Sequence, residues 1–108
     1  MSVDGPLAIA ISGLQANALR AGVAANNIVN QNTPGFKAGE VRTSSIVTAG
    51  SALGGVQAQV FETGFGTGDV DVAMEFSRLI LAENAYRASA ATVRVAEEMA
   101  RETVDIVA

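Results

Sequence analysis

The chain has 108 residues, of which 49% are hydrophobic, 11 are acidic and 7 are basic, and it contains no cysteine and no histidine. This composition excludes a disulfide framework, a thiolate or imidazole metal site, and a nucleophile activated by histidine. The net charge of −4 and the scattered basic residues also argue against a nucleic-acid partner.

Alanine and valine dominate the hydrophobic residues, with 20 and 13 copies. Because these side chains bury little area, one domain of this length has a thin core and gains from helices that approach closely, preferably with neighbouring chains. We expect no membrane-spanning segment, since no run of about 18 apolar residues is present. We also expect no cleaved signal peptide, because no basic residue precedes Arg20 and the apolar stretch at residues 7–11 is short.

The first predicted element is a helix over residues 7–30, with Pro6 at its start. Apolar residues recur along it at alternating spacings of four and three, which is a heptad pattern. This stripe, which we expect to carry helix packing and assembly, consists of Leu7, Ile11, Leu14, Ala18, Ala21, Ala25 and Ile28.

The helix is followed by an unusual run of polar residues that ends in Pro34 and Gly35. Asparagine can adopt left-handed geometry and bond the free carbonyls at a helix end. Pro34 and Gly35 fit the central positions of a type II turn, after which Phe36 would anchor the exit. A plain helix stop explains the turn but not the number of amides. The candidate turn residues are Asn26, Asn27, Asn30, Asn32, Thr33, Pro34, Gly35, Phe36 and Lys37.

The middle of the chain, residues 31–69, is rich in glycine and is predicted to hold a turn and an extended segment. Residues 41–48 and 56–63 have β character, and in the second stretch Val56, Ala58 and Val60 alternate with other side chains. A small β-hairpin and a glycine-loosened extended loop are both compatible with these propensities.

The last predicted element is a helix over residues 70–107, a segment without glycine or proline. At about 1.5 Å per residue it would be roughly 55 Å long, which is too long for a compact globule of this size. It has two apolar faces, which indicates more than one packing partner. The first face includes Val72, Phe76, Leu79, Tyr86 and Val93, and the second includes Met74, Leu81, Ala85, Ala88, Val95, Met99 and Ile106.

These elements predict a mainly α fold of one domain, residues 1–108. The N- and C-terminal helices form an antiparallel pair of coiled-coil type, joined by the short glycine-rich segment. That pair leaves about 15 residues of the longer helix overhanging and one of its apolar faces bare, which is typical of a protein–protein interface.

Two segments resemble a known family. ALRAGVAANNIVNQNTPGFKA resembles the N-terminal signature of the bacterial flagellar axial family, the rod and hook proteins, with Asn26, Asn27 and the run from Asn32 to Lys37 among the matching positions. VDVAMEFSRLILAENAYRASAATVRVAEEM is similar to the C-terminal segment of that family. The connection between the two helices is shorter than is usual there, and Val29 stands where alanine is common.

The resemblance implies a basal-body rod protein of a short, proximal-rod type. Such a chain would be a structural subunit that self-assembles through its terminal helices into a hollow helical tube in the periplasm. Its partners would be copies of itself, other rod and hook–basal-body proteins and the flagellar export apparatus, which would export it without a cleaved signal peptide. The alternative is a helical adaptor or export-associated binding module that reuses the axial termini.

Other motifs favour no chemistry. The glycine-rich run at residues 64–68 resembles a phosphate loop, but no basic residue follows it, so we interpret it as a hinge into the last helix. Asp69, Asp71 and Glu75 lack the pattern of a calcium loop. We therefore expect no enzyme, no cofactor and no metal site.

Overall fold

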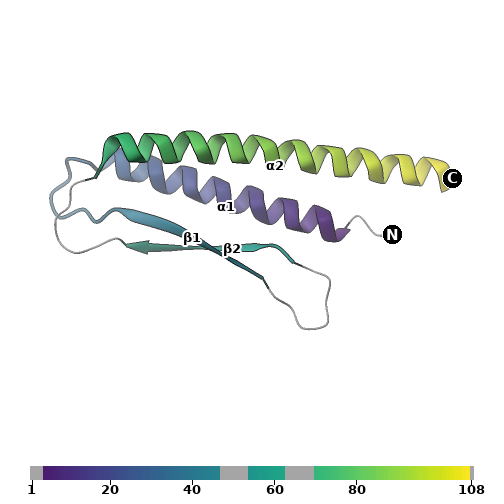
Figure 1. Cartoon of the computed structure of the whole chain (residues 1–108), viewed down its shortest axis with the longest axis horizontal. Helices are drawn as coiled ribbons and strands as arrows, with labels where there is room; N and C mark the ends of the chain where they lie inside the picture. The colour runs from purple at the N-terminus through teal and green to yellow at the C-terminus, as the bar shows by residue number, and fades with distance from the viewer. Residues whose placement is uncertain (1–3, 47–53, 63–69, 108) are drawn as a thin grey trace.

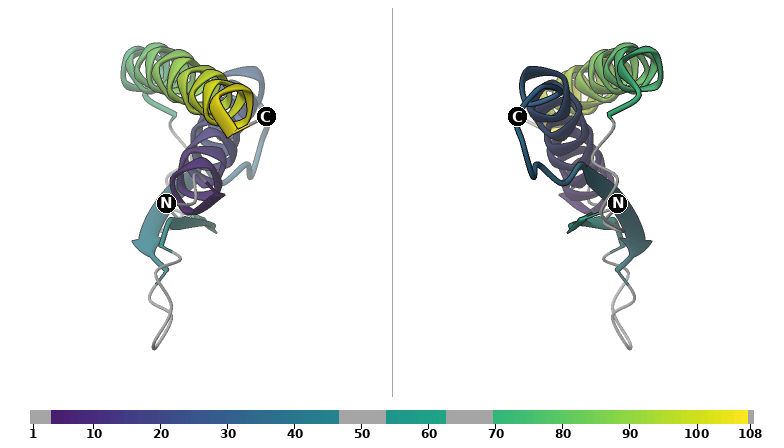
Figure 2. Two further views of the ribbon diagram at one scale, coloured as in Figure 1. Left: turned by 90° about the vertical axis from the view of Figure 1, so that its right-hand side faces the viewer. Right: turned by 90° about the vertical axis from the view of Figure 1, so that its left-hand side faces the viewer.

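The computed structural model describes residues 4–46, 54–62 and 70–107. In chain order it contains α1 (Asp4–Val29), β1 (Gly39–Ser45), β2 (Val56–Glu62) and α2 (Val72–Val107). The two helices run antiparallel, and the two strands lie along α1 on the side away from α2 (Figures 1 and 2). The chain is therefore an elongated three-layer structure of 61 × 29 × 15 Å with α1 in the middle. The predicted mainly α fold, with an antiparallel helix pair and a hairpin, is confirmed.

α1 begins three residues earlier than the sequence pattern indicates. Pro6 therefore lies within the first turn. Main-chain N–H groups in the first turn have no acceptor within the helix, so the lack of an N–H on proline costs no hydrogen bond there. The helix ends at Val29, after which the N–H of Asn30 donates to the carbonyl of Asn26 (3.1 Å) and the N–H of Gln31 to that of Ile28 (3.3 Å). These bonds satisfy carbonyls that the end of the helix would otherwise leave unpaired.

α1 also meets a length and hydropathy criterion for membrane-crossing helices over Leu7–Val29, where the mean hydropathy is 1.2. The sequence expectation was based on an uninterrupted apolar run, which Asn17 and Arg20 prevent. Core helices of soluble proteins, which are mostly buried, and signal sequences near an N-terminus pass the same test, and 22% of this window is buried. Here α1 packs between α2 and the hairpin, and it buries the polar side chains Asn17 and Asn27.

α2 begins after Asp71, whose carboxylate accepts a hydrogen bond from the N–H of Met74 (3.2 Å). This is an N-terminal cap, in which an acidic side chain pairs one of the free N–H groups at the positive end of the helix dipole. With 36 residues against 26, α2 extends past the N-terminal end of α1 (Figure 1). The overhang that the difference in length predicts is therefore present.

β1 and β2 form an antiparallel hairpin whose register runs from Gly39 opposite Glu62 to Ser45 opposite Val56. β1 begins and ends earlier than the predicted stretch at 41–48, whereas β2 agrees with the prediction within one residue. Residues 47–53 between the two strands, which include the end of the predicted stretch at 41–48, lie outside the described residues, as do the glycine-rich run at 64–68 and Asp69. The hairpin replaces the loop alternative.

The core between the helices is built from small side chains. Among the described residues the buried hydrophobic side chains are Ala16 and Ala24 on α1 and Ala82 on α2. A Cβ built on Gly13 would lie 3.5 Å from the hydroxyl of Ser89, so the two helices approach closely at that level. The close contact and the small buried area agree with the thin alanine-rich core that the composition predicts.

Candidate functional site

The turn after α1 is held together by its own polar side chains. The Asn30 amide donates to both the carbonyl and the side-chain oxygen of Asn26, each at 2.9 Å, and the Thr33 hydroxyl donates to Asn30 (3.1 Å). Asn32 is exposed, as are Asn26 and Thr33. Part of the amide run therefore does what the sequence predicts, which is to satisfy carbonyls at the end of the helix.

The predicted type II turn is present at Pro34 and Gly35. The N–H of Phe36 donates to the carbonyl of Thr33 (3.2 Å), and Gly35 has a φ of 74°. That angle is left-handed and favours glycine at the third position of the turn. The expectation that the asparagines would themselves adopt left-handed geometry is wrong, because no non-glycine residue with positive φ occurs in the described part of the chain. Gly35 is the left-handed residue of this turn, and the N–H of Thr33 donates to the carbonyl of Asn30 (3.0 Å) in a further turn before it.

Asn27 joins the turn to the hairpin. Its side chain is completely buried, its amide nitrogen donates to the carbonyl of Gly39 (2.9 Å), and its oxygen accepts the N–H of the same residue (2.9 Å). The side chain thus pairs with the main chain of Gly39 as a neighbouring strand would. A Cβ at Gly39 would lie 3.1 Å from Val23 and 3.4 Å from Val60, so glycine permits this close approach.

Two further contacts attach the hairpin to α1. The Arg20 guanidinium donates to the Thr43 hydroxyl (3.0 Å), and the Ser12 hydroxyl accepts the N–H of Val56 (3.1 Å). Together with the Asn27–Gly39 pair, we call these the three hairpin contacts. They are spaced along one side of α1, from its C-terminal to its N-terminal half. The hairpin is therefore attached to the helix along most of its length.

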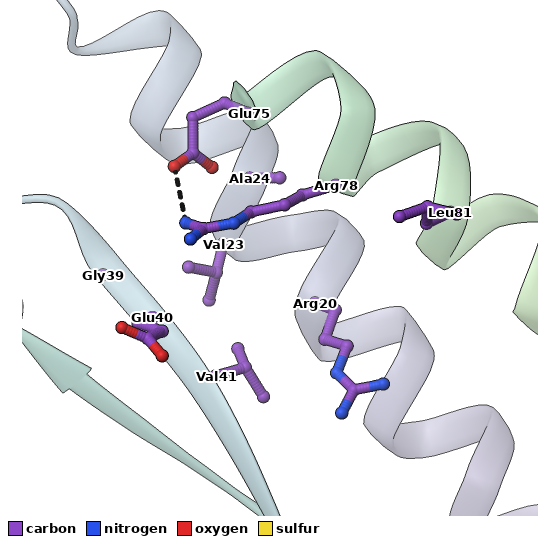
Figure 3. Close-up of a pocket in the computed structure, with 9 residues that line it drawn as sticks. All are labelled: Arg20, Val23, Ala24, Gly39, Glu40, Val41, Glu75, Arg78 and Leu81. Atoms are coloured by element: carbon purple, nitrogen blue, oxygen red, sulfur yellow. Dashed lines mark hydrogen bonds and ion pairs between the residues drawn. The ribbon is translucent and has the colours of Figure 1, made fainter. Parts of the chain in front are cut away.

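A cleft opens where α1, β1 and the first turns of α2 meet (Figure 3). Glu75, on α2, is 2% exposed and forms an ion pair with Arg78 (3.0 Å). Figure 3 shows the Arg78 side chain reaching back to this carboxylate, whereas Arg20 points away from the pair. Because the buried charge is paired, the cleft can hold Glu75 without a ligand. Its remaining lining residues are Val23, Ala24, Gly39, Glu40, Val41 and Leu81.

The residues of the predicted stripe on α1 lie at two levels of burial. Its members at seven-residue intervals are half-buried, namely Leu7, Leu14, Ala21 and Ile28, whereas the intervening Ile11, Ala18 and Ala25 are exposed. The most buried side of α1 is not the stripe but the side that carries the small residues Ala16 and Ala24, which lie in the core. The exposed members face away from the rest of the chain.

The predicted packing residues of α2 divide in the same way. Val72, Leu79 and Val93 are half-buried, whereas Phe76 and Tyr86 are exposed. We expect Tyr86 to pack on an apolar stripe, and in the structure it is 44% exposed. The assembly role of these residues stays a prediction.

Sequence reasoning missed Gly39, Ser12 and Thr43, which hold the hairpin, and it treated Asn27 as one of several equivalent turn amides. The angular position of each residue around the helix distinguishes Asn27 from the other turn asparagines, because Asn27 lies on the same side of α1 as Arg20 and Val23. For Gly39 the sequence offers no signal, since its partner is 12 residues away and the contact depends on the turn between them.

No cluster of three or more acidic side chains that could hold a metal ion occurs in the described residues. The candidate site is therefore a surface and a set of structural contacts, with α1 and its turn as the best-defined part.

A family comparison places this part of the chain. Residues 7–37 match the model of a family described as flagella basal body rod protein. No curated protein sequence matches the chain significantly. The matched residues comprise α1 from Leu7 onward and the turn through Lys37. This segment contains the hydrogen bonds of the asparagine amides, the type II turn and the buried Asn27. The match covers 31 of the 108 residues and shows that this segment is similar to the flagellar basal-body rod family.

Proposed function

We propose that the chain is a structural subunit of the flagellar basal-body rod that assembles with copies of itself and with other rod proteins through its helices. The observation that carries the proposal is the family match over residues 7–37, which supports a structural role in the rod. The match coincides with the segment that fixes where the hairpin leaves α1.

The distribution of apolar side chains supports assembly. Only alanines form the buried hydrophobic core of the described chain, whereas large hydrophobic side chains are exposed along both helices and the hairpin. Sixteen of them are at least about a third exposed, including Ile11, Phe76 and Leu81. Fully burying an exposed large side chain contributes about 1.5–3 kcal/mol, so each of these partly exposed side chains would stabilise an assembly by the share of that energy that matches its exposed fraction.

The proposal also covers where the subunits assemble and how they are exported. The subunits would form a hollow helical tube across the periplasm, and the flagellar export apparatus would deliver them without a cleaved signal peptide. The exposed stripe residues on α1 and α2 would lie in contacts between subunits. The thin core would let the free chain remain only marginally stable until those contacts form.

Quantitative mass spectrometry of detergent-purified basal bodies tests the rod assignment. We expect several copies of the chain per basal body, in a ratio comparable with the other rod components. A chain that is found in the soluble fraction and is absent from basal bodies would refute the assignment and favour the adaptor.

Variants of exposed residues test the assembly surface. Ile11→Asp and Phe76→Asp place a charge on predicted contacts without removing a buried side chain, so they should keep the helical circular dichroism of the chain but abolish incorporation into basal bodies. The matched controls Gln15→Asp and Ser77→Asp are exposed on the same helices and should incorporate normally. Equal incorporation of all four variants would show that these faces are not contacts.

A further inference from the structure

One exposed side of α2 carries a regular heptad pattern along nearly the whole helix. Starting at Met74, its positions recur after four and three residues in strict alternation until Ile106. We call this set the α2 seam, and it consists of Met74, Arg78, Leu81, Ala85, Ala88, Thr92, Val95, Met99, Glu102 and Ile106. Arg78 and Ala85 are half-buried, and the other members are exposed, up to 68% for Leu81 and 84% for Ile106.

The seam is separate from the side of α2 that packs on α1. The α1-facing side includes the buried Ala82 and the half-buried Ser89 and Val93. At 3.6 residues per turn, the seam lies on average about 100° around the helix from these residues, while its half-buried members Arg78 and Ala85 lie nearer, about 40° and 60° from Ala82. A further helix could therefore lie along the seam without displacing α1. Arg78 and Leu81 also line the cleft of Figure 3, so the cleft borders one end of the seam.

The spacing and the residue sizes suit a helix as the occupant. A strict alternation of four and three is the pattern by which two helices pack in a left-handed coiled coil. Small side chains at Ala85, Ala88 and Thr92 occupy the middle of the seam and would let the two backbones approach closely. Larger apolar residues flank them toward both ends. From Met74 to Ile106 the seam is about 48 Å long at 1.5 Å per residue.

The two charged residues of the seam select the partner and its direction. Arg78 and Glu102 lie at equal distances from residue 90, the midpoint of the seam. If a second copy of α2 runs antiparallel about this midpoint, Arg78 of each copy lies opposite Glu102 of the other. The apolar positions then match as well, with Leu81 opposite Met99. A parallel pair in register would instead place Arg78 opposite Arg78 and Glu102 opposite Glu102, which is repulsive.

We propose that a second copy of this chain docks on the α2 seam, with the two α2 helices antiparallel about a two-fold axis near residue 90. The contact is isologous, so both seams are covered and association stops at two chains. Arg78 keeps its ion pair with Glu75 through one guanidinium nitrogen (3.0 Å), and its side chain is 41% exposed, so the other nitrogens are the ones that meet Glu102 of the second copy in two equivalent contacts. The proposal concerns the free chain and does not rest on the rod assignment. In a rod whose subunits all point the same way, this dimer would have to open before its subunits are added.

The absence of cysteine from the chain makes the direction of the helices directly testable. Leu81→Cys mixed with Met99→Cys should form a disulfide-linked heterodimer under mild oxidation, whereas each variant alone should cross-link far less. Sedimentation equilibrium of the unmodified chain should show a monomer–dimer equilibrium. Efficient cross-linking of Leu81→Cys with itself would overturn the antiparallel arrangement, and a chain that stays monomeric at its highest soluble concentration would overturn the dimer.

A matched pair of charge reversals tests the partner of Arg78. Glu102→Arg changes a seam residue, while Glu98→Arg makes the same change in net charge at an exposed position of the same helix outside the seam. Glu102→Arg should weaken dimerisation about tenfold, because two attractive contacts become repulsive, and Glu98→Arg should have little effect. Equal dimer dissociation constants for the two variants would show that residue 102 does not face Arg78.

Discussion

Replacing Asn27 with alanine removes a side chain that bonds both main-chain groups of Gly39. In the folded chain the Asn27 amide gives and accepts one hydrogen bond at 2.9 Å, and it is fully buried. Alanine can make neither bond. The N–H and the carbonyl of Gly39 would then lack their partner at a position that is only partly open to water.

The expected loss of stability follows from these two bonds. A typical hydrogen bond within a protein contributes about 1 kcal/mol net, and leaving a buried group unpaired costs about 1–3 kcal/mol. Because Gly39 is half-buried, water can partly replace the lost partner, so we expect about 2 kcal/mol for Asn27→Ala. A loss of this size in the local opening free energy corresponds to about 30-fold faster amide exchange at Gly39.

Hydrogen exchange followed by NMR measures the effect where it arises, and chemical denaturation measures it for the whole chain. Asn32→Ala is the matched control, because Asn32 belongs to the same turn but is exposed. The control should unfold like the unmodified chain. If Asn27→Ala leaves both the Gly39 exchange rate and the unfolding free energy equal to those of Asn32→Ala, the pairing of Asn27 with Gly39 does not hold the hairpin.

Two further substitutions test close packing, each against a control of the same type. Gly55→Ala should destabilise the chain by about 2 kcal/mol in thermal unfolding, since the new Cβ would lie 2.8 Å from the Ser12 hydroxyl and the residue has a φ of 135°. The control is Gly22→Ala, at a position in α1 with open space around it, which should instead stabilise the chain by about 0.5–1 kcal/mol. A Gly55→Ala variant that is more stable than Gly22→Ala would contradict the geometry of the hairpin contact. Ala82→Leu should lower the unfolding free energy by about 1–3 kcal/mol, because it overpacks the buried interface between the helices. Ala91→Leu, on the exposed side of α2, should change the unfolding free energy little. Equal melting curves for the two variants would mean that the helices do not meet at Ala82.

The helices and the turn could be predicted because their determinants are local. Freedom from glycine and proline defines α2, a capping acid precedes it, and Pro34 with Gly35 specifies the turn without reference to the rest of the chain. The antiparallel pairing and the overhang then follow from the lengths of the two helices. The hairpin could be proposed from alternation but not separated from a loop, because strand formation depends on partners that are distant in sequence.

The orientation of α1 could not be predicted from its heptad stripe. The pattern treats Leu14 and Ala18 as equivalent, whereas α1 must serve α2 on one side and the hairpin on another. Small residues allow the closest approach, so Ala16 and Ala24 are buried and part of the stripe is exposed. Asn27 is buried for a different reason, since two hydrogen bonds to Gly39 compensate its loss of water.

The three hairpin contacts also set an expected order of folding events. Their partners are 12, 23 and 44 residues apart for Asn27–Gly39, Arg20–Thr43 and Ser12–Val56. Because the entropy of closing a loop grows with its length, the last contact costs about 1 kcal/mol more to close than the first if it forms alone. Once Asn27 holds Gly39, each later contact closes only a short additional loop. Docking of the hairpin should therefore begin at the turn and advance toward the N-terminal end of α1, and it should fail first at that end when the chain is warmed.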